Sequence, residues 1–327
     1  MKEKIMSTNT KIRVWSNNWM AGIEDDTNIA EISIPGTHES CARFQLKDAQ
    51  CQWFSIIRQL QNGIRFLDIR CEYETGAESG LTQHIYFPIY HGLKSQNILF
   101  EEVQAQCVAF LEANPTEFVL MNVQMNNEED DPVKFGEKFL ELIEPYKEYW
   151  YTGDGTKLNR DGVPVPDLPA IKDVRKHIVL IRAGSYNVRL GWWLMRANQP
   201  DPGLSWTGFN TNGESSNVVF KTQNWWKNVN GTDKGLLVEK YIREAKNNAA
   251  KGKITLNFAS HTDNATPGGN AQDMNNRLAV YLQSYDFKSP VGVIAIDFTG
   301  NTGISGESLE SQIIKHQSHQ NPNYIYG

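Results

Sequence analysis

The sequence lacks long hydrophobic runs. None of its apolar stretches approaches the roughly 18 residues that a membrane-spanning helix requires. Residues 1–20 contain lysines, but no apolar stretch of about 7–15 residues follows them, so they do not resemble a signal peptide. We therefore expect a protein without a transmembrane segment. A secreted protein whose leader had been replaced by a methionine would have the same sequence.

Cysteine is scarce. The four cysteines are Cys41, Cys51, Cys71 and Cys107, all in the first third of the chain. They show neither CxxC spacing nor clustering with histidine, so a zinc site is not predicted. Four cysteines allow three complete disulfide pairings. We interpret most of them as free thiols that are buried as small hydrophobic residues.

Excess positive charge is also absent. The formal net charge is -6 and the pI is about 5.7, so nucleic acid is not an expected partner. Hydrophobic residues make up 40% of the 327 residues and charged residues 21%, which permits a sizeable core. The 9 Trp, 12 Tyr and 14 Phe suit a core, sugar stacking or a membrane-facing rim.

Short apolar runs alternate with helical patterns along the whole chain, which predicts an α/β fold with a parallel sheet closed into a barrel. An eighth strand is expected in 203–209 or 217–223. The other predicted strands are 28–34, 64–70, 85–90, 117–123, 177–183, 254–259 and 291–297. The predicted helices are 53–62, 99–113, 133–143, 233–250, 271–284 and 306–317.

Polar residues gather where the predicted strands end. The first predicted strand, which runs into the stretch ISIPGTHES (32–40), is expected to stop at a Pro-Gly bend. Barrel enzymes carry their chemistry at the C-terminal strand tips, and two imidazoles, guanidinium groups and carboxylates there would suit phosphoryl transfer. The residues at these tips are His38, Glu39, Asp68, Arg70, His91, Arg182 and Asp297.

Each of these residues also has a purely structural interpretation. A histidine at a strand end is often a hydrogen-bonding residue. Asp68 and Arg70 could form an ion pair that closes the barrel, and Asp297 could cap the following helix. The functional interpretation therefore rests on the set as a whole.

The stretches that carry these residues resemble bacterial phosphatidylinositol-specific phospholipase C. They are WSNNWM (15–20), IPGTHES (34–40), FLDIR (66–70), YHG (90–92) and ID (296–297). The resemblance runs from about residue 13 to 300 in the same order. It implies a single-domain distorted TIM (βα)8 barrel over residues 13–327, preceded by an N-terminal extension of residues 1–12.

The resemblance also implies a reaction. Phosphatidylinositol is cleaved to diacylglycerol and inositol 1,2-cyclic phosphate, which is hydrolysed more slowly to inositol 1-phosphate. His38 would be the general base on the inositol 2-hydroxyl, oriented by Asp297. His91 would be the general acid, paired with Glu39, and Arg70 would bind the phosphate.

Neither a metal nor another cofactor is expected, and Arg70 is the reason. Calcium-dependent relatives have an acidic residue at this position, whereas a guanidinium repels a divalent cation and presents a planar donor fork to phosphate. One alternative stays open, because Glu39, Asp68 and Glu72 could together supply oxygen ligands for calcium.

Several substrate-binding positions depart from the family pattern. Glu39 replaces an aspartate, and Gln124 stands where the family has a lysine. Asn224 and Trp226 replace an aspartate and a stacking tyrosine. Asp68 also belongs to the expected substrate-binding set, and Arg182 resembles the arginine that reaches the inositol ring.

Trp53 matches the aromatic residue through which the family contacts membranes. The implied partner is a phosphatidylinositol membrane surface, contacted transiently by a monomer, with glycosylphosphatidylinositol anchors as a second candidate substrate. The implied location is extracellular, with the leader absent from this sequence; the cytoplasm is the alternative.

The residues at the strand tips also allow two alternative functions to be compared with this one. A glycerophosphodiester phosphodiesterase would need a metal-binding Glu-x-Asp at Asp68-x-Arg70, and a non-catalytic lipid-binding module would not need both histidines.

Overall fold

A computed structural model describes most of the chain. The described residues are 11–44, 49–75, 85–127, 131–183, 186, 191–194, 214–227, 229–263, 266–286, 288–300 and 306–326. Residues 1–10 of the expected N-terminal extension and the strand candidate 203–209 lie outside them. Within the described ranges, none of the helices combines the length and hydrophobicity that crossing a membrane requires.

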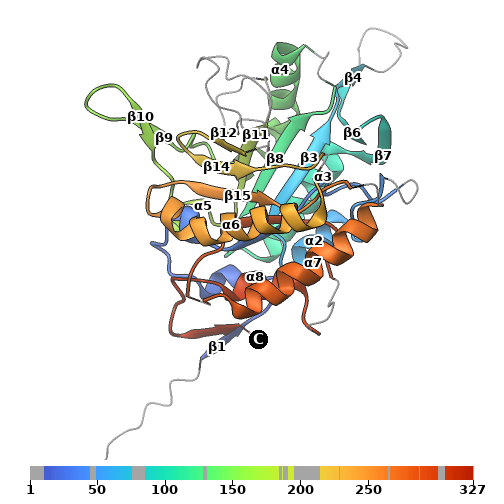
Figure 1. The fold of residues 1–327 in the computed structure, drawn as a ribbon. Helices are drawn as coiled ribbons and strands as arrows, with labels where there is room; N and C mark the ends of the chain where they lie inside the picture. The colour runs from blue at the N-terminus through green and yellow to red at the C-terminus, as the bar shows by residue number, and fades with distance from the viewer. Residues whose placement is uncertain are drawn as a thin grey trace, which may run out of the picture.

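One strongly curved, mostly parallel sheet forms the centre of the molecule (Figure 1). Its strand order is β12-β11-β8-β3-β2-β16-β15-β14-β13, and along this order only β13 joins its neighbour antiparallel; off this order, β6 (Pro88–His91) also pairs antiparallel with β3. The end strands β12 and β13 do not pair with each other within the described residues. The predicted α/β class and distorted barrel are confirmed. The bounds are β2 Ile34–Thr37, β3 Phe66–Cys71, β8 Val119–Met125, β11 Ile178–Ala183, β12 Trp192–Leu194, β13 Glu214–Ser216, β14 Phe220–Gln223, β15 Ile254–Phe258 and β16 Val293–Ile296.

Helices cover the outer face of this sheet (Figure 1). They agree with the predicted set to within a few residues, except that α7 begins four residues earlier and that the short helix α5 was not predicted. Several begin at a side-chain cap that accepts a backbone N–H, such as Asn230 before α6 and Thr266 before α7. The helices are α2 Ile56–Gln61, α3 Phe100–Ala113, α4 Pro132–Ile143, α5 Ile171–Val174, α6 Gly231–Ala249, α7 Pro267–Ser284 and α8 Leu309–Lys315.

Two predicted strands differ from the structure. Residues Ile29–Glu31 form a short 3-10 helix, and the strand begins only at Ile34, so Pro35 and Gly36 lie within β2 and not in a bend. Gly36 is needed there because a Cβ would lie 2.7 Å from the Cβ of Phe66 on β3. The second difference is at 85–90. This segment forms β5 (Ile85–Tyr86) and β6 (Pro88–His91), and β6 pairs antiparallel with β7 (Lys94–Leu99).

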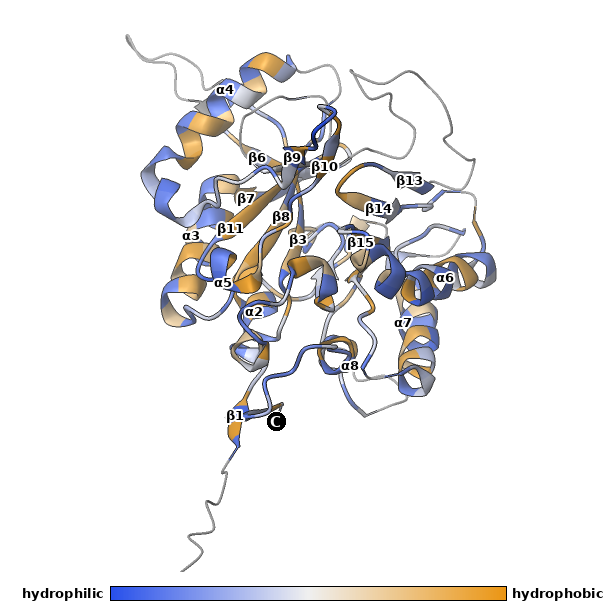
Figure 2. Cartoon of the chain, turned by 90° about the vertical axis from the view of Figure 1, so that its left-hand side faces the viewer, coloured by the Kyte–Doolittle hydropathy of each residue, from blue (hydrophilic) through white to orange (hydrophobic). Residues whose placement is uncertain are grey.

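Side-chain alternation along the strands creates two packed layers. Phe66, Leu120 and Ile181 point into the barrel interior, whereas Leu67, Met121 and Leu180 pack outward against α2, α3 and α4. In Figure 2 these strands are largely hydrophobic and the polar residues gather on helices and loops. The predicted state of the cysteines is confirmed, because all four are free and buried.

A buried ion pair fixes the end of the barrel at which β3 and β8 start. The fully buried Arg65 guanidinium donates to Glu117 at 2.8 Å and also to four backbone carbonyls. Burial lowers the pKa of Arg65, although Glu117 opposes this effect. Arg65 therefore provides hydrogen-bond donors for backbone carbonyls of both the N-terminal segment and the loop before β3.

Glu117→Gln is therefore expected to lower the free energy of unfolding by about 3–5 kcal/mol, because it leaves the Arg65 charge buried without its counter-ion. Urea denaturation measures this change. Glu112→Gln, which removes an exposed partner of Lys176, is the matched control and should leave stability within experimental error. An equal effect of both substitutions would contradict the role assigned to Arg65.

Candidate active site

His38 and Asp297 emerge side by side because their strands are neighbours in register. Thr37 of β2 pairs with Ile296 of β16, so the next residue of each strand projects from the same barrel end. Nδ1 of His38 lies 2.9 Å from Oδ1 of Asp297. Burial alone lowers the pKa of His38, but the charge of Asp297 and its hydrogen bond outweigh burial and raise that pKa above its ordinary value.

Arg70 lies at the tip of β3 and contacts the other side of the same imidazole. Its Nη2 lies 3.2 Å from Nε2 of His38. The guanidinium also forms ion pairs with Glu39 at 2.8 Å and with Asp68 at 3.3 Å. Burial lowers the pKa of Arg70, but the charges of these two carboxylates outweigh burial and raise that pKa above its ordinary value. The guanidinium is therefore permanently charged.

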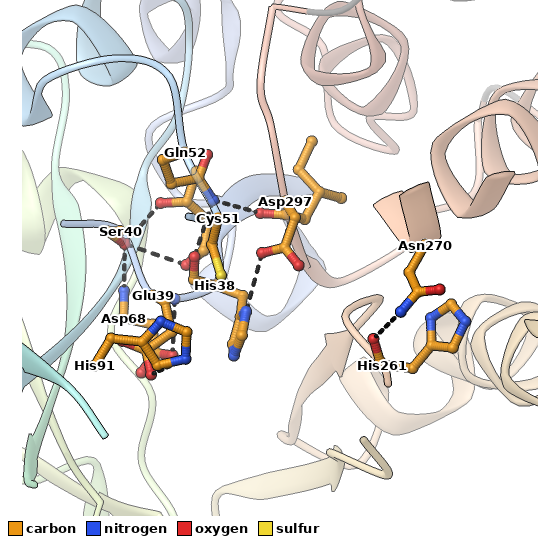
Figure 3. A network of polar contacts seen from close by, with 12 residues as sticks. His38, Glu39, Ser40, Cys51, Gln52, Asp68, His91, His261, Asn270 and Asp297 are labelled. Atoms are coloured by element: carbon orange, nitrogen blue, oxygen red, sulfur yellow. Dashed lines mark hydrogen bonds and ion pairs between the residues drawn. The ribbon is translucent and has the colours of Figure 1, made fainter. Parts of the chain in front are cut away.

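Glu39 joins Arg70 to the second imidazole. Its Oε1 forms the ion pair with Nη1 of Arg70 and lies 3.8 Å from Nε2 of His91, whose Nδ1 donates to the carbonyl of Ala49 at 2.8 Å. Glu39 has φ of +44°, a left-handed conformation that turns its side chain back towards the site. His91 comes from the β6–β7 hairpin and not from a barrel strand as expected. Figure 3 shows both imidazoles near the Glu39 and Asp68 carboxylates.

Three further polar residues support this arrangement and were missed by the sequence analysis. Asn122 donates to Asp68 at 2.8 Å, and the Ser40 hydroxyl accepts the backbone N–H of Asp68. The Gln52 amide donates to the carbonyls of both His38 and Ile296 and so ties the two strand ends together. Asn122 could have been found, since it interrupts the apolar run Val119–Met125 on the same face as Gln124.

Strand register separates two of the predicted substrate-binding residues. Gln124 on β8 pairs with Arg70 on β3 and therefore faces the same side of the sheet. Arg182 pairs instead with Val123, which packs on the helix side of the sheet. The expected contact of Arg182 with the inositol ring is thus not supported, because a shift of one residue along a strand reverses the direction of the side chain.

The remaining predicted residues lie on loops. Asn224 and Trp226 follow β14, and the carbonyl of Trp226 accepts the backbone N–H of Thr262 at 2.7 Å. The Asn224 Oδ1 atom is buried, and Trp226 is 48% exposed. Trp53 is 58% exposed and its ring packs on Phe298, the residue after Asp297, with the ring centroids 4.8 Å apart.

The carboxylates considered as calcium ligands have other partners. Glu39 and Asp68 both form ion pairs with Arg70, and Glu72 accepts a hydrogen bond from the Asn126 amide. The Arg70 charge holds the pKa of Asp68 low despite its burial. The arrangement therefore suits binding of an anion at Arg70, with an imidazole on either side for proton transfer.

Asp297→Asn is expected to lower the pKa of His38, because the substitution removes the charge that raises it. The measurement is an NMR titration of the imidazole resonances. The pKa of His316, which burial lowers, should stay unchanged and serves as an internal control.

The wild-type His38–Asp297 pair also contributes stability, which is complete below the ordinary histidine pKa of about 6.5. That contribution is lost as the pH rises through the raised pKa, so the stability difference between wild type and Asp297→Asn should shrink over the same range. A His38 pKa unchanged by the substitution would contradict the assigned pairing.

Known proteins share both the motifs and the architecture. Residues 33–183 match the family model described as phosphatidylinositol-specific phospholipase C, X domain. A 1-phosphatidylinositol phosphodiesterase of Listeria monocytogenes is 32% identical over 178 residues, which are 52% of this chain and half of that protein's length. The protein of the same name from Staphylococcus aureus strain Newman is 25% identical over 317 residues, which are 91% of this chain and 93% of that protein.

Solved structures agree on the fold. The phosphatidylinositol-specific phospholipase C from Listeria monocytogenes superposes with a TM-score of 0.69 at 24% identity, covering 93% of this chain and 99% of that one. A Staphylococcus aureus phosphatidylinositol-specific phospholipase C superposes with a TM-score of 0.72 at 22% identity, covering 92% and 97%. The family model, the alignments and the fold agree with the sequence motifs: the chain is similar to the bacterial phosphatidylinositol-specific phospholipases C, and the match to the X-domain model lies in residues 33–183.

Proposed function

We propose that the protein is a phosphatidylinositol-specific phospholipase C that releases diacylglycerol by His–His general base and acid catalysis. One observation carries this proposal: two imidazoles, each near its own carboxylate, flank a partly exposed, permanently charged arginine. The names of the bacterial relatives, 1-phosphatidylinositol phosphodiesterase, support the same activity.

In the first step, the geometry suits His38 as the base. Asp297 accepts a hydrogen bond from Nδ1–H of His38, so the lone pair of the imidazole lies on Nε2, where the substrate hydroxyl would replace the Arg70 N–H that faces it at 3.2 Å. Nε2 takes the proton of the inositol 2-hydroxyl as that oxygen attacks the phosphorus. The new O–P bond closes a cyclic phosphate. Since nucleophile and phosphate belong to one molecule, the attack benefits from proximity.

Arg70 and His91 serve the other side of the phosphorus. The Arg70 guanidinium binds the non-bridging oxygens and stabilises the charge that develops on them. Protonated His91 gives its Nε2 proton to the diacylglycerol oxygen as the old P–O bond breaks, and Oε1 of Glu39 lies 3.8 Å from that nitrogen. Slow hydrolysis of the cyclic product reverses the roles, with His91 as base on water and His38 as acid.

The residues at the expected ring-binding positions are less charged than the family pattern implies. Gln124, Asn224 and Trp226 would contact the inositol ring through two amides and an indole face, with Asp68 holding Arg70 in place. Arg182 is not among these ring contacts, because its strand register directs its side chain to the helix side of the sheet. Residues 13–327 would form one catalytic domain with residues 1–12 as an extension.

Trp53 fits a membrane contact, because it is exposed and packs on the residue next to Asp297. The proposal is of a monomeric, secreted enzyme that binds transiently to membranes containing phosphatidylinositol. Glycosylphosphatidylinositol anchors present the same inositol phosphate and are included as a second substrate.

His38→Ala and His91→Ala are each expected to reduce cleavage of phosphatidylinositol vesicles by about 10²–10⁴-fold, the usual contribution of a general acid or base. Thermal melting should stay close to wild type when it is measured above the raised pKa of His38, where the His38–Asp297 pair adds no stability. His91→Ala should lose less activity on a substrate with a good leaving group, whereas His38→Ala should lose equally on both. Similar losses of activity and of stability in both variants would favour the purely structural interpretation.

Phosphorus NMR is expected to detect a cyclic phosphodiester before the monoester, in buffer with excess chelator. The cyclic signal follows from intramolecular attack, and the insensitivity to chelator follows from Arg70 taking the place of a metal. Activity that disappears with EDTA and returns with calcium would contradict the role of Arg70. A monoester that forms without a cyclic precursor would favour direct hydrolysis, as in a glycerophosphodiester phosphodiesterase.

A further inference from the structure

A thiol that the proposed reaction does not use lies beside the base. Cys51 is 2% exposed, and its Sγ lies within 4.8 Å of a ligand atom of both His38 and Asp297. Among the described residues, these three side chains are the group of histidine, cysteine and acidic residues close enough together to hold a metal ion. In Figure 3 the Cys51 sulfur points towards the His38–Asp297 pair.

The backbone holds the three side chains in fixed relative positions. The Cys51 carbonyl accepts the N–H of Phe298 at 2.8 Å, directly after Asp297. The next residue, Gln52, donates to the His38 and Ile296 carbonyls at 2.9 and 3.0 Å. The thiol therefore sits at a defined place relative to the two strand tips, so little conformational freedom is lost when a ligand binds across them.

The donor set has a definite chemical preference. One imidazole nitrogen, one sulfur and one carboxylate oxygen suit zinc and similar thiophilic cations, not calcium or magnesium. Zinc bonds of about 2.0–2.3 Å place tetrahedral ligand atoms roughly 3.3–3.8 Å apart. The side chains would thus have to move by no more than about 1 Å, with water as the fourth ligand.

We propose that a thiophilic divalent cation such as Zn²⁺ binds His38, Cys51 and Asp297 and switches off the base. The cation replaces the proton between His38 Nδ1 and Asp297; that proton moves to Nε2 of the same neutral imidazole, and the proton of the Cys51 thiol passes to solvent. An imidazole that gives its Nδ1 lone pair to a metal carries its remaining proton on Nε2. Nε2 then has no lone pair with which to accept the hydroxyl proton.

Arg70 does not prevent this binding, because it lies on the other edge of the ring. The guanidinium contacts Nε2 at 3.2 Å, whereas the cation would sit on the Nδ1 side between two groups that become anionic, the Cys51 thiolate and Asp297. A proton on Nε2 would face the Arg70 N–H groups, which is a cost. The cation is therefore a reversible inhibitor and not a cofactor, and the catalytic and metal-bound states exclude each other.

Metal binding can be tested without any assay of activity. The probe is Zn²⁺ alone, titrated against a chromogenic chelator with the full chain. Cys51→Ala should weaken the affinity by about tenfold or more, while Cys107→Ala, which removes a buried thiol outside this group, should leave it unchanged. Melting curves in chelator verify that both variants fold. Cobalt(II) should give a sulfur-to-metal charge-transfer band in wild type and in Cys107→Ala but not in Cys51→Ala.

The inhibition rests on the proposed function and is measured separately. Zn²⁺ should inhibit phosphatidylinositol cleavage by wild type and by Cys107→Ala, and the half-inhibiting concentration should rise about tenfold in Cys51→Ala, each relative to its own metal-free rate. Equal Zn²⁺ affinities in all three proteins, or a cobalt band that survives in Cys51→Ala, would overturn the site. Binding without inhibition would overturn the switching of the base. A protein with no activity at all would refute the proposed function and leave the binding test intact.

Discussion

A guanidinium held between two buried carboxylates organises the candidate site. The charges of Glu39 and Asp68 offset the cost of placing the Arg70 guanidinium in this poorly solvated position, and the Arg70 charge in turn lowers the pKa of the buried Asp68. The fixed cation in turn contacts Nε2 of His38, while Asp297 holds Nδ1. Each charged group thus lies in direct contact with a partner of opposite charge or with an imidazole, so the site acts as one electrostatic unit.

Strand β3 carries one arginine at each end of the barrel. Arg65, just before its first residue, is fully buried and pairs with Glu117, while Arg70 near its last residue is partly open to solvent. Both guanidinium groups are surrounded by acceptors, but only the second leaves room for an anion to approach. The same strand therefore connects a structural ion pair with a functional one, and parallel pairing with β2 and β8 aligns the neighbouring strand tips with it.

The contacts around this unit differ more from the family pattern than the unit itself. Gln124 and Asn224 stand where the resemblance implies charged residues, so recognition of the inositol ring would depend on neutral hydrogen bonds. Cys51 adds a soft ligand beside His38 and Asp297, which gives the base a second chemistry besides proton transfer. These features lie next to the reacting groups, yet they can vary without changing the electrostatic balance around Arg70.

The sequence by itself determined the α/β barrel and most of the helices, because continuous apolar runs and capped amphipathic stretches are local patterns. It also identified His38, Arg70 and Asp297, whose motifs stand at strand ends. Tertiary structure alone decided the rest. Pro35 and Gly36 lie in a strand because of the close approach of Phe66, and His91 reaches the site on an antiparallel hairpin. Arg182 turns away through a register of one residue, and Asn122, Gln52 and Cys51 gain their roles from partners far away in the sequence, which no local pattern encodes.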